Sequence, residues 1–367
     1  MQFTANAGVV KKAMRQVWEG AAKKSSGTLS RTFEFKVFNN TLAFVRGRRH
    51  GEQAVEVILR TERGESGDKV TVDASLFDAI KTLDDQCDVT FKFLDSKVEV
   101  SAESGSKFKF SYGYADAPNC LSEFDVDGTD ATFNTSDFIR CAEQTAFAID
   151  TNSAHYALGG VYLALEGVRA SFVATCGRRL AHCSVVCERG DDAGDKAAII
   201  PASAINALIK IIPRDLERVH VKFGETKVVF RWDTGRFITV LIDGNFPNWK
   251  SILGGVKKES EVQYDAGEIR KTTETLAKIG ADSVTITTGK GVMTLENTAK
   301  GASIVAPVPV SVNCVEPITA RLDVRFLNEF LGRARGRVRH FIHEESPNLF
   351  EDEDGYQYLI MPLTPER

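Results

Sequence analysis

The chain repeats one order of structural elements three times. A short extended segment, a polar cap and an amphipathic helix begin at Phe3, Phe133 and Tyr264, so that successive copies start 130 and 131 residues apart. A second helix-forming segment begins at residues 72, 200 and 322, with spacings of 128 and 122 residues. Such a repeat constrains the whole architecture, because each copy is expected to form the same small unit. A chance match of similar elements is the alternative.

Between the two helices of each copy, apolar and polar residues alternate, as in strands with one buried face. In the segment RTFEFKVFNNTLAFV, Asn39 and Asn40 separate two alternating runs and predict a hairpin. We therefore predict an α+β fold of three domains, at 1–125, 126–255 and 256–367, each with two helices packed on antiparallel sheets. The length of 367 residues agrees, because a single core seldom organises so long a chain.

The predicted helices place basic residues outside their apolar stripes. Lys11, Lys12 and Arg15 lie off the stripe of the first helix, and Lys210 lies off that of the middle copy's second helix. The six predicted helices sum to a net charge of +1, within a chain whose net charge is −4. Local attraction to nucleic-acid phosphates would explain this asymmetry, and an ordinary solvated helix face would explain it equally well.

The sequence offers no catalytic or metal-binding constellation. Residues 289–291, GKG, lack the spacing of a phosphate-binding loop. His340 and His343 have no acid between them, unlike the helix of a metalloprotease. The acidic run 351–354 lacks the alternating ligands and central glycine of a calcium loop, and a solvated turn is the simpler interpretation. We expect no enzyme activity, no metal and no cofactor.

Seven cysteines form an odd, scattered set, which predicts reduced thiols rather than a disulfide framework. The group from Cys176 to Cys187 lacks the paired spacings of a zinc site and predicts structural thiols. No run approaches the roughly 18 apolar residues of a membrane span, and the first residues lack the apolar region of a signal peptide. The expectation is a cytoplasmic protein.

Four stretches resemble one known family. Residues 147–185, 199–212 and 241–253, which include ATCGRRLAHCSV and DGNFPNWKSIL, resemble the middle domain of the bacterial DNA polymerase III beta subunit, the sliding clamp. The ending YLIMPLTPER is similar to that family's ending, where a Met-Pro pair precedes the last residues. The resemblance is strong over about 128–255 and at the C-terminus, and weaker elsewhere.

The resemblance implies a head-to-tail homodimer whose six domains form a ring around duplex DNA, with helices lining the hole. Such a clamp is a processivity factor for the replicative DNA polymerase and binds DNA independently of sequence. One alternative is a divergent clamp-like scaffold for repair or phage-type replication partners. A more distant alternative is a small-molecule enzyme that uses the region of Cys176.

The resemblance also implies three sets of site residues. The partner site receives a short linear peptide from the polymerase, the clamp loader and repair factors, at Leu158, Thr175, Gly177, Arg179, Leu180, Pro247, Ile252, Leu359, Met361, Pro362 and Leu363. DNA contacts are implied at Asn152 and Tyr156 and, more loosely, at Lys23 and Lys24, beside the basic helix residues above. The ring interface is implied at Lys107, Phe108, Phe110, Leu276 and Ile279.

Two positions depart from the family pattern within the partner site. Cys176 stands where the family often has Asp, and Arg178 stands where His is common. Without the resemblance, the aliphatic residues of this set would be assigned to the core of one domain.

Overall fold

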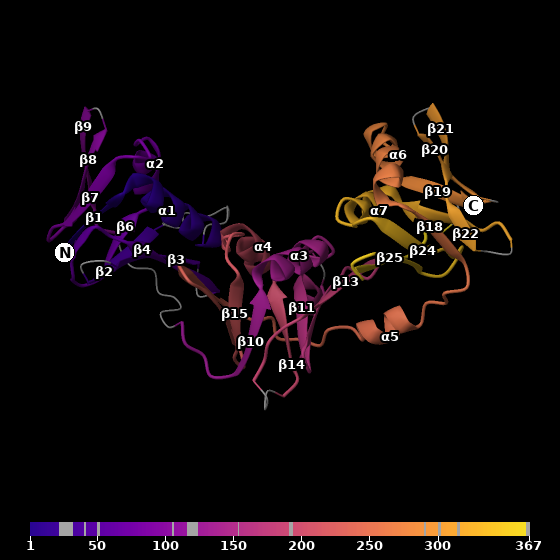
Figure 1. Ribbon diagram of the computed structural model, residues 1–367, viewed down its shortest axis with the longest axis horizontal. Helices are drawn as coiled ribbons and strands as arrows, with labels where there is room; N and C mark the ends of the chain where they lie inside the picture. Colours follow the sequence, from indigo (N-terminus) through magenta and orange to yellow (C-terminus); the bar gives the residue numbers. More distant parts are fainter. Residues whose placement is uncertain are drawn as a thin grey trace. The chain divides into compact units, whose positions relative to one another are not determined.

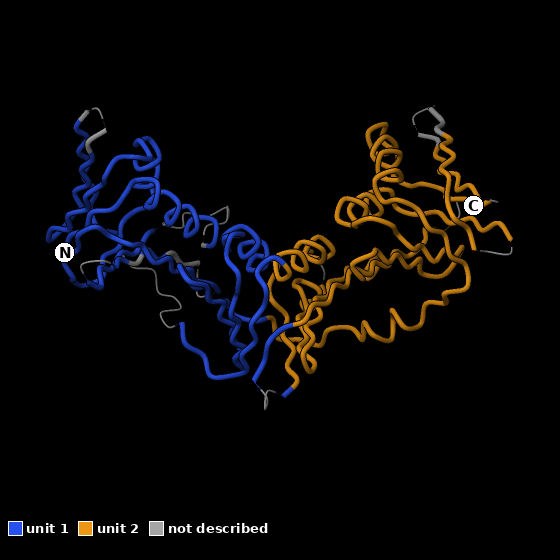
Figure 2. The backbone as a smooth tube through the Cα atoms, viewed as in Figure 1, with its two compact units in different colours: residues 1–136, 187–194, 203–241 blue, residues 137–186, 195–202, 242–367 orange. Residues whose placement is uncertain are grey.

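The computed structural model describes residues 1–21, 32–39, 42–49, 52–104, 106–115, 124–152, 154–190, 194–289, 291–299, 302–313 and 316–364. The chain divides into two compact units (Figure 2). Unit 1 comprises residues 1–136, 187–194 and 203–241, and unit 2 comprises residues 137–186, 195–202 and 242–367. Among the residues described, no helix combines the length and the apolar composition needed to cross a membrane.

Unit 1 is built on two antiparallel sheets (Figure 1). The eight-stranded sheet has the order β10 (Thr129–Asn134), β15 (Arg218–Phe223), β16 (Lys227–Trp232), β17 (Gly235–Val240), β4 (Gln53–Arg60), β3 (Leu42–Arg49), β2 (Thr32–Asn39) and β6 (Val70–Asp73). The five-stranded sheet has the order β5 (Arg63–Glu65), β1 (Gln2–Asn6), β7 (Asp88–Phe93), β8 (Lys97–Ser104) and β9 (Ser106–Gly113).

Three helices accompany these sheets: α1 (Ala7–Ala21), α2 (Leu76–Lys81) and nearly all of α4 (Ala202–Ile211). Helix α1 packs on β3 and β4 through its predicted apolar stripe, which is buried at Val10, Ala13, Met14 and Val17. Removal of this stripe from water is the main force that holds the helix on the sheet.

Unit 2 also combines a long and a short antiparallel sheet. The nine-stranded sheet has the order β14 (Lys196–Pro201), β11 (Gly160–Glu166), β12 (Arg169–Thr175), β13 (Arg179–Val186), β26 (Gln357–Ile360), β25 (Asn348–Asp352), β24 (Arg337–Phe341), β18 (Glu261–Asp265) and β22 (Ser311–Asn313). The four-stranded sheet has the order β21 (Ala302–Pro309), β20 (Val292–Ala299), β19 (Ser283–Thr288) and β23 (Thr319–Asp323).

The helices of unit 2 are nearly all of α3 (Thr135–Ala146), together with α5 (Trp249–Gly254), α6 (Ala266–Lys278), α7 (Val324–Leu331) and the 3-10 turn η1 (Tyr156–Gly159). The carboxylate of Asp265 accepts the N–H groups of Gly267 and Glu268 and so caps α6. Asp323 caps α7 in the same way. Each cap is the last residue of a strand, in agreement with the strand–cap–helix order predicted from the repeat.

The predicted element types are confirmed for all six repeat helices and for the hairpins between them. The second helix of the first copy begins after residue 72, where the segment was predicted to start, since α2 covers Leu76–Lys81. Helix α5 was not predicted. It begins after Asn248, whose side chain accepts the N–H of Ser251 and caps the helix.

Each long sheet is assembled from two copies of the repeat. Strand β17 of the middle copy pairs with β4 of the first copy, and β13 of the middle copy pairs with β26 of the last. The strands and helices of the middle copy are therefore divided between the two compact units. Division into three domains stays a prediction from the repeat.

Candidate partner-binding site

A tight hairpin between β12 and β13 is the centre of the candidate site. The hydroxyl of Thr175 donates to the carbonyl of Arg179 at 2.6 Å and accepts the N–H of Gly177 at 3.1 Å. Gly177 has a φ of +81°, which glycine adopts without steric strain. Thr175 and Gly177 thus shape the hairpin, and their role in the site is to position Arg178 and Leu180.

Six buried side chains form an apolar cluster beside the hairpin. They come from five strands and α5: Val173, Leu180, Leu253, Phe341, Leu349 and Leu359. Leu180 and Leu359 are directly opposite each other in the β13–β26 ladder. Sequence reasoning found only these two members. Phe341 and Leu349 lie on strands 160 or more residues from the hairpin. Val173 and Leu253 lie within the recognised motifs, but the sequence does not show which residues they contact.

The apolar character of the cluster extends to the exterior. Phe246 and Trp249 are half-buried and pack against the cluster, while Ile252 and Met361 are 41% and 39% exposed. We call these four residues the apolar surface. Exposed apolar residues beside a buried cluster are typical of sites that bind an apolar partner segment.

The C-terminal segment is fixed beside the hairpin. The N–H of Met361 donates to the carbonyl of Arg178 at 2.9 Å, and the N–H of Leu363 donates to the carbonyl of Arg321 at 2.7 Å. Pro362 and Leu363 are half-buried. The structure therefore brings the predicted C-terminal residues next to the β12–β13 hairpin.

Arg179 occupies a different place from its neighbours in the predicted set. Its side chain is only 9% exposed, and its guanidinium pairs with Glu329 of α7 and donates to the carbonyl of Phe147 at 2.7 Å. The same guanidinium lies 4.3 Å from the centre of the Phe326 ring. Arg179 therefore holds β13 against α7 and the residue after α3, and it is not an exposed contact residue.

Two aromatic contacts hold the α5 segment on the long sheet. Phe246 stacks on Tyr162 with ring centres 4.8 Å apart, and Trp249 stacks on His182 at 4.6 Å. His182 also bonds the side chain of Gln357, and burial lowers its pKa, which keeps the ring neutral at pH 7. These contacts place Ile252 on the apolar surface.

The two other predicted partner residues lie at the ends of loops. Leu158 is half-buried in η1, where its N–H donates to the carbonyl of His155 and its carbonyl accepts the N–H of Asp150. Pro247 is half-buried, and its carbonyl accepts the N–H of Trp249 at 2.7 Å. Pro247 thus belongs to the α5 segment, whereas Leu158 belongs to the turn before β11.

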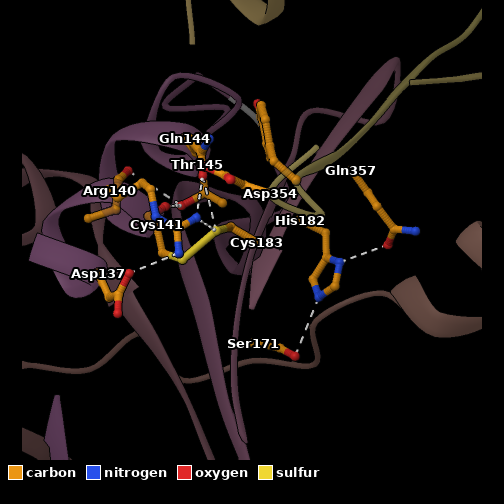
Figure 3. The surroundings of a disulfide bond; sticks show 12 residues. Asp137, Arg140, Cys141, Gln144, Thr145, Ser171, His182, Cys183, Asp354 and Gln357 are labelled. Atoms are coloured by element: carbon orange, nitrogen blue, oxygen red, sulfur yellow. Dashed lines mark hydrogen bonds and ion pairs between the residues drawn. A yellow bond between two sulfur atoms is a disulfide. The ribbon is translucent and has the colours of Figure 1, made fainter. Parts of the chain in front are cut away.

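A disulfide joins Cys141 of α3 to Cys183 of β13 (Figure 3). The prediction that all the cysteines are reduced is wrong for this pair. Their Cα atoms are 5.3 Å apart although 42 residues separate them in sequence, and only the packing of α3 against β13 reveals the proximity. Cys87, Cys176 and Cys187 are free thiols.

The acidic run 351–354 forms a structured turn. The carboxylate of Asp352 accepts the N–H groups of Arg335, Asp354 and Tyr356, and burial raises its pKa. Glu351 pairs with Lys258 at 2.6 Å. Within the described ranges, no three His, Cys, Asp or Glu residues are grouped in a way that could hold a metal ion.

The predicted DNA contacts of unit 1 divide into paired and unpaired cations. Lys11 pairs with Asp85 at 2.6 Å, and Lys210 pairs with Glu19 at 3.2 Å. Lys12 and Arg15 are exposed and form no ion pair with any residue that the structure describes. Their spacing of three residues puts them on the same face of α1. Lys23 and Lys24 lie outside the described residues.

In unit 2, Asn152 and Tyr156 are both exposed, and Tyr156 is 82% exposed. Helix α6 adds two exposed cations that the sequence did not single out, Lys271 and Lys278. They are seven residues apart and therefore on one face of the helix. The net charge of the helix did not reveal these two lysines, because Glu268 and Glu274 on the same helix cancel their charge.

The predicted interface residues also differ in accessibility. In unit 1, Lys107 and Phe108 are exposed and Phe110 is half-buried on β9, an edge strand of the five-stranded sheet. In unit 2, Ile279 is half-buried directly after α6, but Leu276 is fully buried within its own unit. Leu276 is therefore a core residue of its unit, and its side chain is not accessible to a second chain.

Comparison with known proteins agrees with this geometry. Residues 132–248 match the profile of the DNA polymerase III beta subunit, central domain. This middle part of the chain is therefore similar to the central domain of that family. The chain is 25% identical over 307 residues to the beta sliding clamp of Caulobacter vibrioides, an alignment that covers 79% of this chain and 80% of the relative.

The fold resembles solved clamps along the entire chain. The structure of the DNA polymerase III subunit beta from Pseudomonas aeruginosa aligns with a TM-score of 0.88 and 21% identity, covering 100% of both chains. A sliding clamp from the same organism bound to griselimycin aligns with a TM-score of 0.89 and 20% identity, again over 100% of both chains. The predicted α+β clamp fold is confirmed.

Proposed function

We propose that this chain is a DNA sliding clamp, the processivity factor of a replicative DNA polymerase. The observation that carries the proposal is the match of residues 132–248 to the central domain of the family, because this segment contains the β12–β13 hairpin and ends at Asn248, the residue that caps α5. The clamp catalyses no reaction itself. It keeps the polymerase on DNA, so that rebinding occurs at a high effective concentration.

The ring of this proposal is a head-to-tail dimer of three-domain chains, divided at 1–125, 126–255 and 256–367. Edge strands β9 and β21 suit such pairing, since no described strand pairs with their outer side and each carries an exposed apolar residue, Phe108 at 41% and Val305 at 58%. Strand β21 also contains Pro307 and Pro309, opposite Thr294 and Val292 of β20. A proline in a ladder faces its missing N–H to the open edge, so pairing with a second copy would use the part of β21 before residue 307.

Duplex DNA would pass through the ring and meet helix cations. Lys12 and Arg15 of α1 and Lys271 and Lys278 of α6 are suited to this role, because no described carboxylate neutralises them. Tyr156 and Asn152 would add contacts from the loop before β11. Lysine and arginine contacts to phosphates depend little on base sequence, which allows movement along the duplex.

The partner peptide of the polymerase, the clamp loader or a repair factor would bind the apolar surface. Aromatic rings at Phe246 and Trp249, an aliphatic Ile252 and an adaptable Met361 suit several related apolar segments. A cytoplasmic location follows from this role.

Retention on DNA tests the ring. The clamp is loaded by a bacterial clamp loader onto a nicked circular plasmid, and the plasmid is then either left circular or cut once with a restriction enzyme. We expect the clamp to stay with the circle during gel filtration and to be lost from the linear form. Equal retention on both forms would show that the chain grips DNA without encircling it, as expected of a scaffold protein.

Primed-circle synthesis tests the partner surface. The double substitution of Ile252→Ala and Met361→Ala should shorten the products of DNA polymerase III while the mass of the dimer stays unchanged. The exposed Val168→Ala, elsewhere in unit 2, is the control and should leave product length unaltered. Products of full length with the double variant would exclude the apolar surface as the polymerase site.

A further inference from the structure

We propose that Arg178 selects partner peptides that carry an acidic side chain next to their apolar residues. This inference rests on the proposed partner site and specifies the chemistry of its occupant. Arg178 lies in the β12–β13 hairpin, and its carbonyl accepts the N–H of Met361, a member of the apolar surface. A peptide bound over Met361 therefore passes beside Arg178.

The side chain of Arg178 is exposed and carries a charge that no described carboxylate neutralises. Its guanidinium lies 5.4 Å from the centre of the Phe326 ring. Arg179 and Arg325 contact the same ring, at 4.3 and 5.1 Å, but Arg179 pairs with Glu329 and Arg325 pairs with Asp323 at 3.3 Å. Three arginines and two carboxylates leave one uncompensated positive charge at this ring.

Two other cations near the site, Lys250 and Lys258, form ion pairs within the protein. Lys250 of α5 pairs with Glu166 at 2.5 Å, and Lys258 pairs with Glu351 at 2.6 Å. Arg178 differs from these two lysines, because its positive charge has no partner among the described carboxylates.

The position of Arg178 is fixed by the protein before any partner binds. Its backbone is held by the hydrogen bonds of Thr175 and by the bond that its carbonyl accepts from the N–H of Met361, and its guanidinium lies 5.4 Å from the centre of the Phe326 ring. A planar guanidinium offers two parallel N–H groups to one carboxylate, and a held guanidinium loses less entropy on pairing. The expected gain is about fivefold in affinity, since the pair stays partly exposed to water.

A matched peptide set tests this inference. The probes are acetylated, fluorescently labelled hexapeptides that all contain two leucines and one phenylalanine. They come in three pairs, one for each remaining position, and the two peptides of a pair differ only in having Asp or Asn at that position. Binding to the full-length clamp is measured by fluorescence anisotropy. We expect at least one position at which the Asp peptide binds about fivefold more tightly than its Asn counterpart, and this preference should disappear in Arg178→Gln.

Arg169→Gln is the control, because Arg169 is an exposed cation on the same pair of strands at its far end, opposite Val186. This variant should keep the preference for Asp. Equal binding of Asp and Asn peptides at every position, or a preference that survives Arg178→Gln, would overturn the inference and leave the partner site in place. If no peptide binds the wild-type clamp, both the partner site and the inference are refuted.

Discussion

Replacing Arg179 distinguishes a residue that contacts partners from one that holds the fold. In Arg179→Gln, the guanidinium that joins β13 to Glu329, Phe147 and Phe326 is lost. The charged hydrogen bond to the Phe147 carbonyl contributes about 2 kcal/mol, the cation–π contact about 1 kcal/mol, and the partly exposed ion pair about 0.5 kcal/mol. Since these terms overlap, we expect the apparent free energy of unfolding to fall by about 3 kcal/mol.

Urea unfolding followed by tryptophan fluorescence measures this loss. With a denaturant slope of about 3 kcal/mol per molar, the midpoint should fall by about 1 M. Arg178→Gln is the matched control, because the adjacent arginine is exposed and should leave the midpoint unchanged. A double variant with Glu329→Gln should lose less than the sum of the single variants, because the two residues share one interaction.

Peptide affinity provides the decisive comparison for Arg179. A positioning role predicts that weaker binding accompanies the stability loss and is restored in part by Arg179→Lys, which keeps the charge. The reasoning is refuted if Arg179→Gln leaves the urea midpoint within about 0.2 M of wild type while peptide binding disappears. Arg179 would then contact the partner directly.

Three further predictions concern the disulfide, a buried histidine and the edge strand. Reduction of the Cys141–Cys183 bond, which closes a loop of 42 residues, should lower the free energy of unfolding by about 4 kcal/mol. The double variant Cys141→Ser with Cys183→Ser should not respond to reductant. A wild-type protein that is equally stable with and without dithiothreitol would contradict this prediction. Burial lowers the pKa of His340 from 6.5 to about 4, so the unfolded chain takes up the proton first as the pH falls. About 3 kcal/mol of the free energy of unfolding should therefore be lost between pH 6.5 and pH 4. The variant His340→Gln should lose correspondingly less over that range, and identical pH profiles of the two proteins would rule out a lowered pKa at His340. Phe108→Asp should shift the sedimenting species from two chains to one, while Phe38→Asp, also at an exposed residue of unit 1, should leave the dimer intact; a dimeric Phe108→Asp would exclude β9 as the interface strand.

Periodicity was sufficient to predict the six repeat helices and the hairpins between them, but not α5. The apolar stripe of α1 and the Asp265 cap of α6 are local features, and the structure has them where the repeat places them. The repeat did not show that β17 pairs with β4 and β13 with β26, because pairing between copies depends on which strand edges remain open after each copy folds. The compact units consequently differ from the copies.

The candidate site was predictable where it coincides with short motifs. Leu180, Leu359 and Met361 lie in or next to the two motifs that carry the family resemblance, and the structure brings them together. Arg179 and Leu276 were assigned contact roles although both are buried, because a motif records identity but not the direction of a side chain. The Cys141–Cys183 bond was missed for a related reason, since its two elements approach only in the folded unit.

Strand β13, which contains Leu180, is an interior strand of the nine-stranded sheet, with β12 along one side and β26 along the other. A receptor made of interior strand barely changes when it is occupied, so nearly all the loss of freedom on association falls on the incoming segment. Short tails that are unstructured in solution should accordingly attach weakly and leave quickly. Such rapid dissociation would let many different partner proteins bind one after another at the same site.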